Sequence, residues 1–181
     1  IYIYTCIFHD CPLKTVYIGG NISYSTSSDR GYSPFYRNTS LEKVIITDKE
    51  TEITANEFYG CTRLKYISMG DGIEKIGDWA FSGCSSLDFF RVGSNVKTIG
   101  KEAFVSCAAV EELTIPASVE SIGKNAFDGT SIEAVVFDGT KERWTAIGGE
   151  TSGIDIEKIR HSCDKGSAWL SNGGEHWHES P

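Results

Sequence analysis

The sequence lacks features that would assign it to several common functional classes. Its 181 residues carry a net charge of −8 rather than the basic balance of a nucleic-acid-binding domain, so we expect no nucleic-acid partner. No apolar run approaches the ~18 residues that a membrane-spanning helix needs. No signal peptide heads the chain, and Ile3 precedes Phe8 by the spacing that separates Ile76 from Phe81, so we expect the chain to begin within a structural repeat.

Motifs of the common enzyme classes are absent as well. The chain has no G-x-S-x-G, no P-loop and no H-E-x-x-H. His9 stands apart from the histidines of the C-terminal segment, beside Phe8 in a predicted turn, and no nucleophile is evident near it. We therefore expect neither enzymatic activity nor a cofactor.

What the sequence does have is a 23-residue repeat that is marked by phenylalanine. Five phenylalanines follow one another at this spacing: Phe35, Phe58, Phe81, Phe104 and Phe127. Three residues after each comes a small residue: Asn38, Cys61, Cys84, Cys107 and Thr130. An L-x-x-V-x-I strand pattern comes next, and a less regular copy begins at Phe8. Self-similarity at a fixed period of this length is typical of a solenoid.

The repeat predicts the architecture. We expect a mainly β, right-handed leucine-rich repeat solenoid with a parallel concave sheet and short helical turns on the convex side. The predicted strands lie near residues 13–18, 41–46, 64–69, 87–92, 110–115 and 132–137. Residues 1–137 would form six coils, of which the first is incomplete, and residues 138–181 would form a C-terminal capping segment.

Two small-residue positions of the repeat favour specific roles. Glycine follows isoleucine in successive repeats, at Gly77, Gly100 and Gly123, which predicts a tight or left-handed turn there. Cys11, Cys61, Cys84 and Cys107 share one repeat position, which favours a column of buried free thiols. Adjacent coils lie ~4.8 Å apart, a distance that also permits disulfides. Cys6 and Cys163 lie outside the pattern.

The repeat text also resembles a known family. V-x-x-I-G-x-x-A-F-x-x-C-x-x-L-x-x-V-x-I, clearest in 73–92 and 96–115, resembles the BspA-like leucine-rich repeats, the treponemal type with a 23-residue unit. Residues 137–147 look like the segment that often closes such arrays. Departures include Glu50 at an Ile/Val position and Glu57 at the alanine position. The resemblance implies a bacterial cell-surface or secreted protein that adheres to host matrix proteins and cells.

The outward positions of the predicted concave sheet are the candidate binding residues. Tyr66 and Phe89 would lie on adjacent strands, beside Lys43 and Arg91, with Tyr17 further along the same face. Exposed aromatic residues next to arginine are typical of interface hot spots. The alternative is that these side chains only cover the sheet. A polar insertion, Ser25–Pro34, predicts a surface loop that is either functional or simply tolerated.

The C-terminal segment changes in composition. Thr140 is a predicted N-cap of a helix through Ile147, Ile154–Ile159 alternates like a strand, and 172–174 suggest a hairpin turn. His161, Cys163, His176 and His178 are weak zinc candidates, because neither pair has the spacing of a zinc finger. We therefore predict an end cap with no metal site.

Two classes of function remain open from the sequence. The leading hypothesis is an extracellular or cell-surface module, monomeric, that binds a host or extracellular-matrix protein. The alternative is a passive structural spacer or a glycan-binding array on the bacterial surface. A coherent, non-repeating patch on one face favours binding, whereas a uniform surface favours a spacer.

Overall fold

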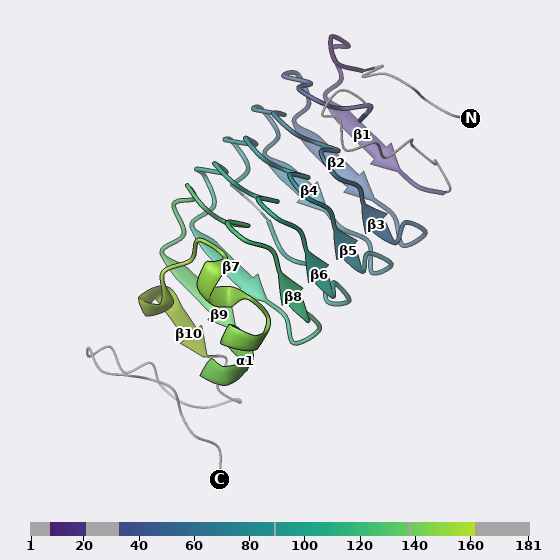
Figure 1. Ribbon diagram of the computed structural model, residues 1–181. Helices are drawn as coiled ribbons and strands as arrows, with labels where there is room; N and C mark the ends of the chain where they lie inside the picture. Colours follow the sequence, from purple (N-terminus) through teal and green to yellow (C-terminus); the bar gives the residue numbers. More distant parts are fainter. Residues whose placement is uncertain (1–7, 21–32, 89, 138, 162–181) are drawn as a thin grey trace.

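The chain winds through a stack of similar coils. The structure is a computed structural model that describes residues 8–20, 33–88, 90–137 and 139–161. Successive coils place their longer strands along one side of the stack and their two-residue strands along another, and a helix lies at the C-terminal end of the described array (Figure 1). All of the strand pairs in the described residues are parallel, as the repeat predicts.

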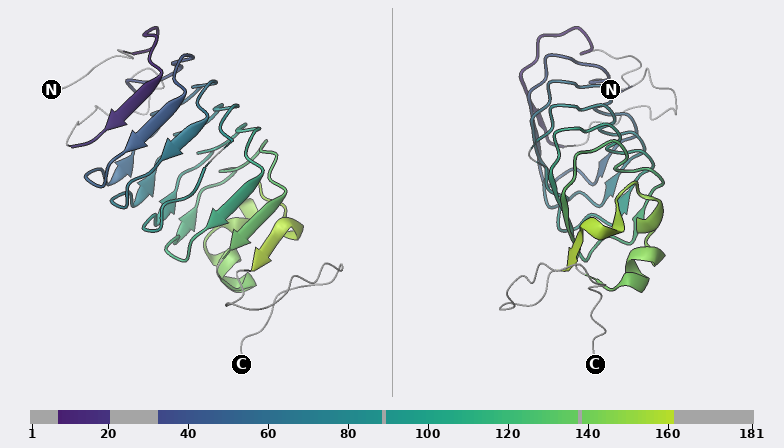
Figure 2. Two further views of the ribbon diagram at one scale, coloured as in Figure 1. Left: turned by 180° about the vertical axis from the view of Figure 1, so that it is seen from behind. Right: turned by 90° about the vertical axis from the view of Figure 1, so that its left-hand side faces the viewer.

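The longer strands form two three-stranded sheets. The first contains β1 (Thr15–Ile18), β2 (Lys43–Ile46) and β4 (Tyr66–Ser68), and the second contains β7 (Glu112–Ile115), β9 (Ala134–Phe137) and β10 (Ile159–His161). Equivalent repeat residues pair, for example Lys43 with Tyr66 and Glu112 with Ala134. The repeat therefore sets the register of the ladder. Figure 2 shows these strands from behind.

The second extended stretch of each coil forms a separate four-stranded sheet. Its strands are β3 (Glu52–Ile53), β5 (Lys75–Ile76), β6 (Thr98–Ile99) and β8 (Ser121–Ile122). Each pairs with its neighbour in register across four consecutive coils. This sheet runs without interruption past the coil in which the longer strands are interrupted.

The prediction of a strand at 87–92 is wrong for the residues that the structure describes there. No strand is assigned among residues 87–88 and 90–92, so the first long-strand sheet ends at β4 and the second begins at β7. Phe90 occupies the central inward position, where neighbouring coils have Val44, Ile67 and Leu113. Its ring lies 4.3 Å from that of Phe104, centroid to centroid, and it is buried. The side chain of Phe90 is larger than the aliphatic side chains at this position and requires more space between the strand and the core. We attribute the interruption of the strand to this difference in size.

The core is a continuous column of phenylalanine rings. Phe8, Phe35, Phe58, Phe81, Phe104 and Phe127 stack with centroid distances of 5.1–5.5 Å and nearly parallel planes. The spacing across the interrupted coil, 5.1 Å between Phe81 and Phe104, is no wider than elsewhere. Phe90 has therefore not spread the column. Coil–coil burial of these rings stabilises an array that no single coil could stabilise alone.

Of the tight or left-handed turns predicted at Gly77, Gly100 and Gly123, the left-handed alternative is wrong, because none of the three has a positive φ angle. Tight turns do begin at Gly77 and Gly123, whose carbonyl oxygens accept from the N–H groups of Ala80 and Ala126 at 3.3 and 3.2 Å. A Cβ atom at these positions would lie only 2.3–2.5 Å from backbone atoms of the preceding coil, so glycine is required by close approach. The left-handed residues instead lie two positions before and two positions after each core phenylalanine. They include Asn56, Trp79, Glu102 and Asn125 before the ring, and Arg37, Gly60, Gly83, Ser106 and Gly129 after it.

The cysteine prediction is confirmed. Cys61, Cys84 and Cys107 are buried free thiols, and Cys11 is half-buried. Burial raises the pKa of the Cys61 and Cys107 thiols to about 12. A thiol with so high a pKa is protonated and acts as a hydrogen-bond donor in the core rather than as a nucleophile. Cys6 and Cys163 lie outside the described residues.

A short helix covers the C-terminal end of the described coils. The predicted helix is confirmed as α1 (Lys141–Ala146), with the Thr140 hydroxyl accepting from the Arg143 N–H, 3.3 Å. The fully buried Trp144 packs edge-on against Phe137, with 5.1 Å between ring centroids. No helix in the part of the chain that the structure describes is long and apolar enough to cross a bilayer.

The segment after α1 continues the backbone ladder of the last coil. Carbonyl oxygens of Ile147, Thr151 and Ser152 accept from backbone N–H groups of residues 122, 125 and 127. The predicted strand Ile154–Ile159 is wrong: η1 (Gly149–Thr151) and η2 (Ile156–Lys158) are 3-10 helices, and the strand is β10. The hairpin predicted at 172–174 lies outside the described residues.

Candidate functional site

The long strands direct alternate side chains inward and outward. Burial alternates along β1, β2, β7 and β9, with Val44, Ile46 and Leu113 buried and their neighbours exposed or half-buried. This alternation follows from the two-residue period of an extended chain. The candidate residues Tyr17, Lys43 and Tyr66 therefore lie on the outward face, as predicted.

Four of the outward side chains gather on the first long-strand sheet. Thr15 pairs with Lys43 and Lys43 with Tyr66, while Tyr17 pairs with Ile45. Tyr17, Lys43, Ile45 and Tyr66 thus occupy neighbouring strands in register, and we call these four residues the β1–β4 patch. Tyr17 is 72% exposed, the most exposed large hydrophobic side chain in the described residues.

A cation–aromatic contact links two members of the β1–β4 patch. The Nζ of Lys43 lies 5.1 Å from the centroid of the Tyr66 ring. An ammonium group over a tyrosine face is attracted by the ring quadrupole. The contact places a positive charge beside an aromatic ring, as predicted, with Lys43 as the partner that the structure shows.

Charged residues border the β1–β4 patch. Lys14 Nζ donates to Glu42 Oε1 at 2.5 Å, and the hydrogen bond and charge of Lys14 lower the pKa of the Glu42 carboxyl. Both side chains are exposed. Exposed ion pairs of this kind contribute little to stability. The Lys14–Glu42 pair therefore matters for the charge at the border of the β1–β4 patch rather than for the stability of the fold.

The other two candidate residues follow the interrupted strand. Phe89 lies outside the described residues. Arg91 is exposed but belongs to no strand that pairs with β4. The described residues therefore do not form the strand that was predicted to place Phe89 and Arg91 next to Tyr66, and a shared role for these residues stays a prediction.

The remaining sequence candidates are only partly described. His161 ends β10, whereas Cys163, His176 and His178 lie outside the described residues. Among residues that the structure describes, no group of three or more His, Cys, Asp or Glu side chains could hold a metal ion. Ser33 and Pro34, the end of the predicted surface loop, are buried, and the Ser33 hydroxyl donates to the Glu57 carbonyl at 2.6 Å. Most of that loop is not described.

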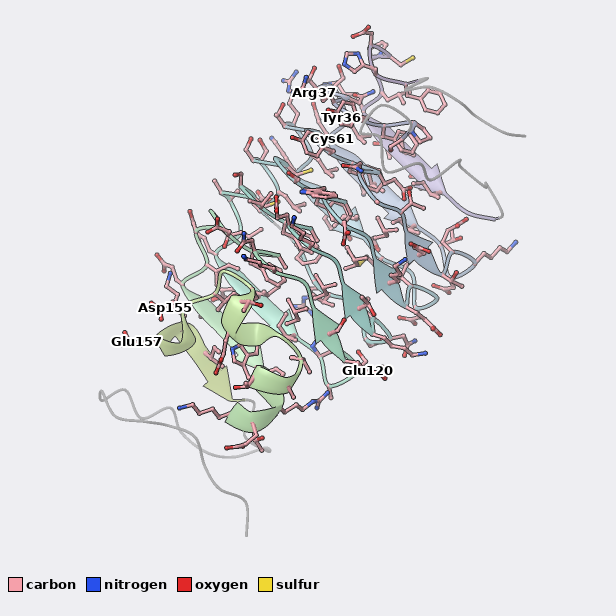
Figure 3. All side chains as sticks on the ribbon, viewed as in Figure 1. Tyr36, Arg37, Cys61, Glu120, Asp155 and Glu157 are labelled. Carbon is pink, nitrogen blue, oxygen red and sulfur yellow. The ribbon has the colours of Figure 1, made fainter. Side chains whose placement is uncertain are left out.

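Sequence reasoning missed a second group of aromatic side chains. Tyr36 and Tyr59 each follow a core phenylalanine by one residue, and their rings stack at 5.0 Å. The Arg37 guanidinium lies 5.6 Å from the Tyr36 centroid, and Figure 3 labels both residues near the N-terminal end of the described array. The 23-residue spacing of the two tyrosines was visible in the sequence and could have indicated this pair.

The repeat geometry agrees with the comparison of the chain with known protein families. Residues 30–146 match the BspA type leucine-rich repeat region, in six copies. The chain belongs to the BspA-type leucine-rich repeat family. Leucine-rich repeat solenoids of this kind are typically binding scaffolds rather than enzymes. A search of curated proteins found no match.

Solved structures of bacterial leucine-rich repeat proteins have the same fold. A leucine-rich repeat protein from Bacteroides ovatus has a TM-score of 0.70 and 26% identity, over 85% of this chain and 37% of that one. The T. pallidum leucine-rich repeat protein has a TM-score of 0.56 and 28% identity, over 68% and 52% of the two chains. A leucine-rich cell surface protein of Faecalibacterium prausnitzii has a TM-score of 0.51 and 23% identity, and it is similar in fold. This BspA-type chain thus spans about half or less of these proteins.

Proposed function

We propose that this repeat domain is a protein-binding module whose ligand contacts the β1–β4 patch. The observation that carries the proposal is the in-register group of Tyr17, Lys43, Ile45 and Tyr66 on one exposed sheet face. The two tyrosines and the isoleucine provide apolar contact area, and tyrosine is enriched at interface hot spots. Lys43 adds a positive charge beside them.

The surface is not uniform along the array, which favours binding over a passive spacer. At the outward positions of β7 stand Glu112 and Thr114, and at those of β9 stand Ala134 and Val136. Among the outward residues that the structure describes on the paired long strands, the aromatic side chains, Tyr17 and Tyr66, belong to the first sheet. A spacer or a glycan-binding array that repeated one site along its length would be expected to repeat its outward residues from coil to coil.

The proposed setting is the bacterial cell surface or the extracellular medium, with a monomer that adheres to a host or matrix protein. Family membership and the similarity to a protein described as a cell surface protein support this setting. The net charge of −8 favours a partner that is at least partly basic. Binding to such a partner should weaken as salt rises.

The experiment is a binding measurement against a panel of purified matrix proteins, with fibronectin, laminin and collagen immobilised separately. A positive result is repeated with the single variants Tyr17→Ala, Lys43→Ala and Tyr66→Ala. Lys75→Ala is the matched control, because Lys75 is also an exposed strand lysine, paired with Glu52 at 2.7 Å in the other sheet.

We expect the tyrosine variants to lose affinity by roughly thirtyfold or more, as truncation of a hot spot costs about 2 kcal/mol. Lys75→Ala should bind like the parent protein. Equal affinity in all four variants would exclude the β1–β4 patch as the contact surface. Failure to bind any matrix protein, even at low salt, would favour the spacer.

A further inference from the structure

The second aromatic group borders a cleft on the turn edge of the coils, away from the β1–β4 patch. The cleft has a volume of about 400 Å³ and is bordered by turn residues of several consecutive coils. Those that matter for its chemistry are Arg37, Tyr59, Gly60, Thr62, Ser82 and Gly83. The volume falls within the about 300–1,000 Å³ of small-molecule sites.

The cleft begins where a column of tyrosines stops. Tyr36 and Tyr59 occupy the position after the core phenylalanine in consecutive coils, and their rings stack at 5.0 Å with an interplanar angle of 13°. In the next coil the same position is Ser82. Ser82 has no ring that could stack on Tyr59, and both residues border the cleft. The next place in the aromatic column is therefore part of the cleft.

Glycine keeps the floor of the cleft open. Gly60 and Gly83 both have positive φ angles, 69° and 75°, and neither has a side chain that could fill the space between the coils. A Cβ atom at Gly60 would lie 2.9 Å from Cγ of Arg37, so the stem of Arg37 lies directly over this glycine. Gly60 and Gly83 therefore leave the backbone at the base of the cleft exposed, and Gly60 makes room for the side chain of Arg37.

Arg37 brings a positive charge to the cleft. Among the residues that the structure describes, no carboxylate forms an ion pair with its guanidinium, whose central carbon lies 5.6 Å from the Tyr36 centroid. A planar guanidinium presents parallel N–H donors that match a carboxylate. His9 and Asp10 also border the cleft, and His9 Nδ1 lies 2.8 Å from Asp10 Oδ1, so the Asp10 carboxylate accepts a hydrogen bond there.

The backbone of the floor leaves no N–H group for a peptide strand. The Gly60 N–H donates to the Ser82 carbonyl at 2.7 Å, and the Gly83 N–H donates to the Val105 carbonyl at 2.8 Å. Recognition must therefore come from side chains. Thr62 adds a hydroxyl that can both donate and accept, which suits a ligand rich in hydroxyl groups.

We infer that this cleft binds a saccharide that carries a carboxylate. One sugar ring takes the open place in the tyrosine column and stacks its C–H face on Tyr59, since those hydrogens are attracted to the negative face of the aromatic ring. Its carboxylate pairs with Arg37, and its hydroxyl groups bond to Thr62. Both sialic acids and uronic acids have this chemistry, and the site is separate from the one proposed for a protein partner.

The test uses the whole chain and three defined sugars. Saturation-transfer NMR and titration calorimetry are performed with 3′-sialyllactose, with a glucuronic-acid disaccharide, and with lactose as the neutral control. We expect saturable binding of at least one acidic sugar, at least tenfold tighter than that of lactose. If only one acid binds, it identifies the source of the carboxylate; if both bind, the recognition is of the shared group.

Two variants locate the binding in the cleft. Arg37→Asn removes the positive charge, and asparagine tolerates the left-handed backbone conformation of this position. This variant should weaken binding at least tenfold. Ser82→Tyr fills the open place with the residue that the two preceding coils carry there, and should abolish binding while Arg37 remains. Thermal unfolding confirms that each variant is folded, and Lys75→Ala, in β5 and outside both proposed sites, should bind the sugar like the parent.

Four results would overturn the inference. One is the absence of saturable binding of either acidic sugar. Another is an affinity for lactose that equals the affinity for 3′-sialyllactose. The third is competition by a short Asp/Glu peptide as effective as that by the acidic sugars, which would show recognition of the carboxylate alone. Unchanged binding in both folded variants would likewise place the sugar elsewhere.

Discussion

The thiol of Cys84 donates a hydrogen bond to the backbone carbonyl oxygen of Phe58, one coil earlier, across 3.2 Å. Cys61 donates to Phe35 at 3.1 Å, and Cys107 donates to Phe81 at 3.2 Å. Asn38, at the same repeat position, donates its side-chain N–H to the carbonyl oxygen of Phe8. In these four coils the position holds a small side chain that donates across the coil boundary, which explains why asparagine can replace cysteine there. Thr130, at the same position of the last repeat, instead donates to the Phe127 carbonyl of its own coil at 2.8 Å.

Replacement of Cys84 by alanine should lower the free energy of unfolding by about 1–3 kcal/mol. The variant loses the thiol donor to the Phe58 carbonyl and leaves a small cavity in a core position that is 0% exposed. Cys11→Ala, in a half-buried position at the N-terminal end of the column, is the control and should cost less. Chemical denaturation measures both, and equal losses would contradict the importance of the buried donor.

The thiols should also differ in reactivity. Cys61, Cys84 and Cys107 are buried, and burial raises the pKa of each of them, so they should resist alkylation at pH 8 in the folded protein. Half-buried Cys11 should react first. Alkylation followed by peptide mapping, with and without denaturant, checks this. Rapid labelling of Cys84 under native conditions would show that the coils open locally.

Glu57 should make stability depend on pH. It stands at the alanine position of the repeat, is 3% exposed, and burial raises its pKa from 4.5 to about 7 despite hydrogen bonds from Thr54. The folded protein therefore holds a proton that the unfolded chain releases between pH 4.5 and 7. The free energy of unfolding should fall by about 3 kcal/mol as pH rises through this window, and should then level off.

Glu57→Gln separates this effect from that of the other carboxyl groups. Glutamine keeps an acceptor for the Thr54 N–H and has no charge to bury, so the variant should be more stable than the parent above pH 7 and should lose most of the slope. Denaturation curves at pH 4.5, 6 and 8 provide the measurement. Parallel pH profiles for the two proteins would show that Glu57 is ionised and solvated.

A smaller residue at position 90 should restore the interrupted strand. In Phe90→Leu the side chain is closer in size to Ile67 and Leu113 of the neighbouring coils. We expect amides near residues 88–92 to gain protection from hydrogen exchange, even if the variant loses about 1 kcal/mol from the aromatic contacts with Phe104. Phe90→Tyr, which keeps the ring, is the control. Unchanged exchange in Phe90→Leu would require another cause for the interruption.

Removal of the residues after Phe137 should make the chain aggregate. The truncation would uncover Phe137 and leave the N–H groups of Ile122, Asn125 and Phe127 without the carbonyl partners they have at residues 147, 151 and 152. An exposed sheet edge beside apolar core favours association. Light scattering and thermal melting provide the test. A soluble monomer that melts cooperatively would show that the last coil needs no cap.

Much of the array follows from local repetition. The phenylalanine column, the inward positions of the strands and the cysteine column follow from the 23-residue spacing, because stacked coils bring equivalent residues into contact. The N-cap at Thr140 was likewise predictable, since capping depends on neighbours within one turn. The outward orientation of Tyr17, Lys43 and Tyr66 follows from the same alternation.

The sequence by itself determined the repeat, the parallel register and the identity of the buried columns, because each depends on one residue type at one interval. The tertiary structure alone decided what depends on the volume and the backbone of adjacent coils. It showed that the long strand is interrupted where Phe90 occupies the inward position that aliphatic residues hold in neighbouring coils, and that Gly77 is fixed by contact with the preceding coil rather than by its own φ angle. It also placed Arg37 and Ser82 beside Tyr59 to form a cleft, because the shape of such a surface depends on which side chains meet across coils.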